Sequence, residues 1–265
     1  MIHIRKHFSI IILLICISFI ANSQDISLYQ KHLFVQNGDT MPYRILLPKN
    51  FDAKKKYPLI LFLHGSGERG ADNELQLVHG SSFFLTDSVR EKYPAIVVFP
   101  QCPLKSSWSN LTVVTDSATK KRTLIFEVDG QPALGMKLLL HLLNYLEDNY
   151  SLNKHRMYVG GLSMGGMGTF ELVRREPKLF AAAFSICGGA NPTTAKKLKY
   201  PSWWIFHGLK DDVVNPEFSK IMAEAIRQQG AEVKLTLYPD ANHNSWDSAF
   251  AEKDLMPWLF AHHNK

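Results

Sequence analysis

Residues 158–168 read YVGGLSMGGMG, in which five glycines surround the single serine Ser163. Glycine weakens the interior of a helix or a strand, so a cluster of this kind needs a structural reason. The preceding residues 156–161 have the apolar character of a buried strand, and residues 163–175 have a helical pattern. The serine is therefore predicted to lie on a strand-to-helix turn.

A turn of this type exposes the serine hydroxyl and strains its backbone, so the residues two positions away must be small. Gly161 and Gly165 meet that requirement in the G-x-S-x-G pattern, which is weak evidence on its own and gains weight from its strand–helix context. The start of the following helix would also favour negative charge developing beside Ser163. These features predict a nucleophilic serine.

Apolar runs of strand length alternate with helical patterns on both sides of this turn. The Asn37-Gly38 pair between two apolar runs indicates an antiparallel hairpin. Six nearly continuous apolar runs suit strands buried on both faces. They cover residues 58–65, 95–101, 156–161, 181–189, 202–208 and 233–239. Helices are predicted at 132–149, 163–175, 215–230 and 247–263, the last broken or bent near Pro257. The order predicts an α/β fold with a doubly wound, mostly parallel sheet of about eight strands and an antiparallel N-terminal hairpin.

Residues 109–131 do not fit this alternation. Two strand-like pieces, LTVVT and TLIFEV, flank a polar DSATKK segment. We expect an inserted hairpin at the carboxyl ends of the sheet strands, which is the edge where ligands bind in open α/β sheets. The pattern does not distinguish a functional lid from a surface insertion.

The N-terminal residues 1–23 resemble a cleaved signal peptide. Arg5 and Lys6 precede an apolar run over residues 8–20, and Ala21 and Ser23 suit cleavage before the next residue. The expected mature chain, 24–265, is one domain in the periplasm or outside the cell, with no stable membrane insertion. An uncleaved N-terminal anchor is the alternative.

The remaining composition narrows the class of function. The chain has a formal net charge of +6, but its lysines and arginines are scattered, so a nucleic-acid surface is not expected. No dinucleotide or phosphate-binding glycine motif is present, so no cofactor is expected. Cys102 and Cys187 each follow an apolar run and are expected to be separate thiols.

A serine nucleophile needs a base and an acid, which in this arrangement follow it in the order acid, then histidine. His243 lies in the loop after the last predicted strand, and we assign it as the general base. Asp211 and Asp212 follow the preceding strand, and spacing alone does not separate them. His207 ends that strand, and a loop-bracing role is expected for it. The acid would fix the imidazole tautomer and stabilise the imidazolium.

Two backbone N–H groups must face the developing oxyanion. Met164, which follows the nucleophile, supplies one, and Ser66 supplies the other, with Gly67 as the alternative. His64 is expected to brace this second loop. A metal site formed by His64 with the other strand-end histidines is not favoured, because no ligand spacing typical of such sites is present.

Together these motifs resemble the α/β-hydrolase fold, over about residues 40–260. More narrowly they are similar to bacterial esterases of the dienelactone-hydrolase and feruloyl/acetylxylan-esterase type, often described as predicted peptidases. The matching segments are LFLHGSGERG, FPQCP, YVGGLSMGGMGTF, FAAAFSICGG, FHGLKDDVVNP and NHNSW. In that family the acid is the fourth residue after the histidine of the His-Gly pair, which implies Asp211. Ser163 and His243 match the family's other two catalytic positions.

The sequence therefore predicts a serine carboxylic-ester hydrolase that forms an acyl-enzyme, with acetyl or feruloyl esters of polysaccharides as substrates by analogy. A serine peptidase on the same residues and a non-catalytic carbohydrate-binding relic are the alternatives. Gln101, Trp108 and Trp246 are expected at the same sheet edge and are candidates for lining a substrate pocket.

Overall fold

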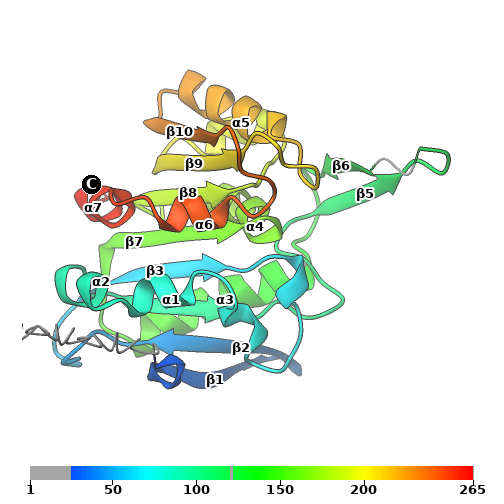
Figure 1. Ribbon diagram of the computed structural model, residues 1–265. Helices are drawn as coiled ribbons and strands as arrows, with labels where there is room; N and C mark the ends of the chain where they lie inside the picture. Colours follow the sequence, from blue (N-terminus) through cyan, green and yellow to red (C-terminus); the bar gives the residue numbers. More distant parts are fainter. Residues whose placement is uncertain (1–24, 120–121, 265) are drawn as a thin grey trace, which may run out of the picture.

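The computed structural model describes residues 25–119 and 122–264. Its main feature is an eight-stranded sheet in the order β1-β2-β4-β3-β7-β8-β9-β10 (Figure 1). The strands are β1 (Tyr29–Gln36), β2 (Asp39–Leu46), β3 (Tyr57–Leu63), β4 (Ile96–Pro100), β7 (Leu152–Leu162), β8 (Ala182–Ile186), β9 (Ser202–Gly208) and β10 (Val233–Tyr238).

The strand pairing is antiparallel at one end of the sheet and parallel through the rest. Strand β1 pairs with β2, and β2 pairs with β4, in antiparallel registers. Strands β4, β3, β7, β8, β9 and β10 pair in parallel. The prediction of a mostly parallel sheet of about eight strands with an antiparallel N-terminal hairpin is confirmed. Parallel strands bring their carboxyl ends to one edge, where the loops that follow them meet.

Helices cover both faces of the sheet and bury two separate clusters of apolar side chains (Figure 1). Helices α3 (Leu134–Asn149), α4 (Met164–Arg175) and α5 (Glu217–Gln228) cover one face. Helices α1 (Ser81–Leu85), α2 (Asp87–Lys92), α6 (Trp246–Phe250) and α7 (Leu255–Ala261) cover the other.

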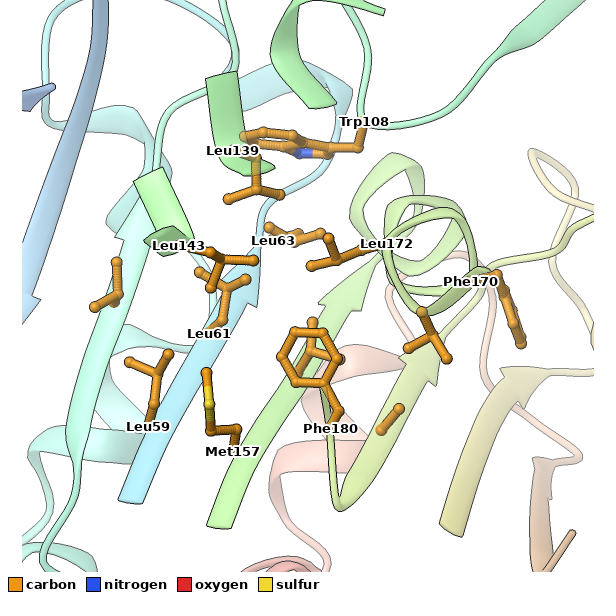
Figure 2. Close-up of a cluster of buried hydrophobic side chains, with 14 of the residues drawn as sticks. Leu59, Leu61, Leu63, Trp108, Leu139, Leu143, Met157, Phe170, Leu172 and Phe180 are labelled. Carbon is orange, nitrogen blue, oxygen red and sulfur yellow. The ribbon is translucent and has the colours of Figure 1, made fainter. Parts of the chain in front are cut away.

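Strand β3 shows the physical basis of this layering, because its successive side chains point to opposite faces. Leu59, Leu61 and Leu63 enter the cluster under α3 and α4, part of which is drawn in Figure 2. Ile60 and Phe62 enter the cluster on the other face. A central strand of a parallel sheet is therefore apolar at every position, as its sequence predicted.

The C-terminal helix differs from its prediction. The helical pattern over 247–263 forms two helices, α6 and α7, separated at residues 251–254 rather than at Pro257. Pro257 lies in the first turn of α7, where a proline is tolerated because the N–H groups of that turn have no partner within the helix.

Residues 109–131 contain β5 (Leu111–Thr115) and β6 (Arg122–Phe126), which form a separate two-stranded antiparallel sheet. It projects from the carboxyl-terminal edge of the main sheet (Figure 1). Asn110 joins the two ends of this insertion: its side-chain amide donates to the Gln131 carbonyl at 2.8 Å, and its oxygen accepts from the Ala133 amide at 3.0 Å. The base of the hairpin is thus fixed to the body of the domain.

The expected signal peptide, residues 1–23, lies outside the described residues. Within the described ranges, no helix combines the length and the apolar character needed to cross a bilayer. Cys102 and Cys187 are both buried free thiols, as expected from their positions after separate strands.

Candidate active site

Ser163 lies on the turn between β7 and α4 with the strained backbone that its glycine-rich surroundings predicted. Its φ of 53° is unusual for a residue other than glycine. A Cβ atom on Gly165 would lie 1.9 Å from the Leu63 carbonyl oxygen, and one on Gly161 would lie 2.4 Å from the Gly165 oxygen. Because these contacts are with backbone atoms, no side-chain rearrangement could relieve them. Both glycines therefore permit the close packing of the turn against β3.

The three predicted catalytic side chains form one hydrogen-bonded chain. His243 Nε2 lies 3.0 Å from Ser163 Oγ, and His243 Nδ1 lies 2.8 Å from Asp211 Oδ2. Their loops follow β7, β9 and β10, so three parallel strands deliver them to one edge. The geometry fits Nδ1–H donating to Asp211, which leaves Nε2 to accept the serine proton.

Close contact between two loops brings the histidine and the acid together. The Lys210 amide donates to the Ala241 carbonyl at 3.0 Å, which ties the loop after β9 to the loop after β10. A Cβ atom on Gly208 would lie 2.4 Å from the carbonyl oxygens of both Ala241 and Asn242. The glycine of the His-Gly pair therefore lets the histidine loop approach the acid.

Asp211 is the carboxylate that reaches His243. Its Oδ1 accepts from the Val213 and Val214 amides, both at 2.9 Å. Burial alone would raise the pKa of Asp211, but hydrogen bonds from His207, His243 and these amides hold that pKa well below its usual range. The group is thus an ionised acceptor at neutral pH. Asp212 is exposed, and its amide donates to Asn242 Oδ1 at 3.2 Å.

His207 also contacts Asp211, although the sequence pattern predicted only a loop-bracing role for it. Its ring is fully buried, and Nε2 lies 3.1 Å from Asp211 Oδ2. Its position in β9, four residues before Asp211, is the sequence signal that could have placed it beside the acid. Asp211 Oδ2 therefore lies between two imidazole rings.

A cavity of about 280 Å³ opens beside Ser163. One wall is apolar and includes Leu111 and Val113 of β5 and Leu124 of β6. Val113 and Leu124 are directly opposed in the hairpin, so their side chains point to the same face. Lining residues from elsewhere in the chain are Ser66, Arg69, Ser107, Met164, Met167, Val213 and Val214. The inserted hairpin is therefore part of the site.

The two expected oxyanion donors lie at this cavity. Ser66, the first residue of the 3₁₀ turn η2 (Ser66–Glu68), and Met164, the first residue of α4, both line it next to Ser163. Backbone N–H groups in the first turn of a helix have no partner within the helix and are free to bind an oxyanion. Gly67, the alternative donor, is not among the lining residues.

Gln101 and Trp108 do not line the cavity, contrary to expectation. Both side chains are fully buried, and their polar atoms bind other parts of the protein. Gln101 Oε1 accepts from the Asn73 amide at 2.8 Å. Trp108 Nε1 donates to the His64 carbonyl at 3.1 Å, and its ring lies in the apolar cluster drawn in Figure 2. Both side chains therefore pack inside the protein near the site and do not line the cavity.

His64 has the bracing role expected of it. Its Nε2 accepts from the Cys102 amide at 2.9 Å, and its Nδ1 lies 2.6 Å from the Gly65 carbonyl, so Nδ1 carries the proton. Burial lowers the pKa of His64 to about 4, which keeps the ring neutral. The ring joins the loop after β3 to the loop after β4.

Trp246 lies beside the site but is not among the cavity-lining residues. Its ring packs edge-on against the His243 ring, with centroids 5.4 Å apart, and also contacts the His79 ring at 4.8 Å. Trp246 therefore packs against the histidine and does not form part of the cavity wall.

One group in the described part of the chain has the donor spacing of a metal site: Cys187, Asp211 and His243, whose donor atoms lie within 4.8 Å of one another. Asp211 and His243 already bind each other, and His243 also binds Ser163. Burial raises the pKa of the Cys187 thiol well above its usual range, and a protonated thiol is a poor metal ligand. The donor set therefore suits a hydrogen-bonded catalytic chain better than a cation.

Comparisons with known proteins identify the family of this chain. Residues 36–258 match the Esterase family, described as "Putative esterase". Feruloyl esterase B of Thermothelomyces thermophilus is 26% identical over 237 residues, which cover 76% of this chain and 74% of that protein. A bifunctional acetylxylan esterase/xylanase of Neocallimastix patriciarum is 33% identical over 75 residues, which cover 28% of this chain and 11% of the fungal protein.

The crystal structure of a thermostable esterase superimposes with a TM-score of 0.77 and 32% identity, covering 89% of this chain and 63% of that one. The chain thus spans only part of two of these relatives. The family match nevertheless includes the loops that carry Ser163, Asp211 and His243. The chain belongs to the Esterase family and has the α/β-hydrolase fold.

Proposed function

We propose that this protein is a secreted serine carboxylic-ester hydrolase that forms an acyl-enzyme on Ser163. The observation that carries the proposal is the unbroken chain from Ser163 Oγ to His243 at 3.0 Å and from His243 to Asp211 at 2.8 Å, at the edge of a cavity. Nucleophile, base and orienting acid each have the partner that acyl transfer requires.

In the first half of the reaction, Ser163 Oγ attacks the ester carbonyl carbon while His243 Nε2 takes its proton. The carbonyl oxygen becomes an oxyanion, which the Ser66 and Met164 amides stabilise. Collapse of this intermediate breaks the bond to the alcohol oxygen, and the imidazolium returns its proton to that oxygen. Water then attacks the acyl-enzyme by the same steps, releasing the acid and restoring the serine.

The substrate class follows from the cavity and from the relatives. A cavity of about 280 Å³ with an apolar hairpin wall accommodates an aromatic acyl group and exceeds what an acetyl group needs. The names of two relatives specify feruloyl and acetylxylan esters. We therefore assign feruloyl esters of polysaccharides as the first substrate class and acetyl esters as the second.

The test uses p-nitrophenyl acetate, which reports the chemistry without demanding a particular pocket. The wild-type protein is expected to hydrolyse it, and Ser163→Ala is expected to lower kcat by about 10⁶-fold, as loss of the nucleophile does in serine hydrolases. Equal rates for both proteins would refute the assignment. Release of ferulate and acetate from natural polysaccharides, measured beside release of amino acids from peptides, separates the esterase from a peptidase.

A further inference from the structure

His207 is a buried titratable side chain that the proposed mechanism does not use. It belongs to β9, is fully buried, and contacts both the loop that follows β9 and helix α5. Its Nε2 lies 2.9 Å from the Val214 carbonyl oxygen and 3.1 Å from Asp211 Oδ2. Its Nδ1 lies 2.6 Å from Ser219 Oγ, at the start of α5.

These contacts decide where His207 carries a proton. Both atoms facing Nε2 are oxygens that only accept hydrogen bonds, a carbonyl and a carboxylate. An unprotonated Nε2 would point its lone pair at two acceptors in a buried site, which is costly. Nε2 is therefore protonated. In the neutral ring Nδ1 then accepts from the Ser219 hydroxyl at 2.6 Å, and the Ser219 oxygen also lies 3.0 Å from the Gly188 carbonyl oxygen.

We propose that His207 is a positioning residue of the esterase, whose Nε2–H fixes the Asp211 carboxylate so that Oδ2 faces His243. The inference rests on the proposed function. The amides of Val213 and Val214 hold Oδ1, and His207 provides the second donor near Oδ2. With donors at both oxygens, the carboxylate cannot rotate away from the histidine. The contact with the Val214 carbonyl fixes the same turn at its far end.

A core histidine with no influence on the reaction would be equally buried. The test therefore compares two variants in which an amide side chain replaces the imidazole. The side-chain nitrogen of glutamine can reach the position of the imidazole Nε2, whereas that of asparagine reaches the position of Nδ1. His207→Gln therefore keeps a donor toward Asp211, and His207→Asn keeps a polar group toward Ser219 only. Both variants remove the ring, so both lose comparable packing.

We expect His207→Asn to lower kcat on p-nitrophenyl acetate by about 10- to 100-fold with KM unchanged, the range found when a residue that orients a catalytic ligand is lost. His207→Gln should recover most of kcat. Thermal unfolding of both variants measures the shared loss of stability. Equal kcat values for the two variants would overturn the proposal, because the donor at the Nε2 position would then have no effect.

A double-mutant cycle with Asp211→Asn gives the second readout. If His207 acts through Asp211, His207→Asn should lower kcat in the wild-type background and have no further effect in the Asp211→Asn background. The same fold loss in both backgrounds would also overturn the proposal. Ser163→Ala serves as the reference: activity that survives in this variant refutes the proposed function itself, whereas an inactive Ser163→Ala with an additive cycle refutes only the role of His207.

Discussion

The wall of the cavity formed by the β5–β6 hairpin should determine which acyl groups the enzyme accepts. Val113 and Leu124 face the cavity as a directly opposed pair. Replacing both by alanine removes five carbon atoms from that wall. A fully buried methylene contributes about 0.8 kcal/mol, and these side chains are partly exposed, so about half of that value per carbon gives a loss of about 2 kcal/mol for a large acyl group.

This loss corresponds to about a 30-fold decrease in kcat/KM, since 1.36 kcal/mol is a tenfold change. The assay compares p-nitrophenyl ferulate with p-nitrophenyl acetate, which share a leaving group and differ in the acyl group. The variant Val113→Ala/Leu124→Ala should lose activity on the ferulate, and it should keep its activity on the acetate because a small acyl group does not reach the hairpin.

The hairpin also provides a matched control. Val114 and Ile125 lie on its opposite face, are 47% and 45% exposed, and do not line the cavity. Val114→Ala/Ile125→Ala should leave kcat/KM for both esters unchanged. If the control variant lost as much ferulate activity as the test variant, or if the test variant lost acetate activity equally, the hairpin would not be a specificity wall.

Two further predictions concern the catalytic chain and the turn that carries the nucleophile. Asp211→Asn should lower kcat by about 10⁴-fold, because the histidine then loses its orienting acceptor, and Asp212→Asn should have little effect; steady-state kinetics of the two variants decide between the aspartates. Gly165→Ala places a Cβ atom 1.9 Å from a β3 carbonyl oxygen and should lower the free energy of unfolding by at least about 3 kcal/mol in urea titrations. Gly67→Ala, with no atom within 4 Å of its new Cβ, is the matched control and should unfold like the wild type.

The fold was predictable because its central strands are buried on both faces. A strand such as β3 is apolar at every position, and the helices between strands have their own apolar stripes, so strand and helix patterns alternate clearly. The short helices α1 and α2 between β3 and β4 carry too few residues for such a stripe, and the sequence did not place them.

The sequence predicted the order of the site residues along the chain but not the directions in which their side chains point. Strand ends put Asp211 and Asp212 at the same edge, where spacing does not separate them. The family resemblance implied Asp211, and the turn geometry directs the Asp211 carboxylate toward His243. The same limit applies to Gln101 and Trp108, which follow β4 at the expected edge but point into the body of the domain. A residue at the end of a strand can be placed at one edge of the sheet from the sequence. The direction of its side chain depends on how the neighbouring loops pack.

The loops and the hairpin are expected to have different roles because they are attached to the domain in different ways. The loops after β7, β9 and β10 carry Ser163, Asp211 and His243, and each is fixed by a parallel strand before it, so their relative positions depend on the main sheet. The hairpin pairs only with itself and is joined to the domain at its base. Substitutions of its inner side chains should therefore leave the distances between the three proposed catalytic groups unchanged. A fold arranged in this way can alter the ester it accepts while it retains the chemistry, which is why the substrate prediction rests on the hairpin and the reaction prediction rests on the strand ends.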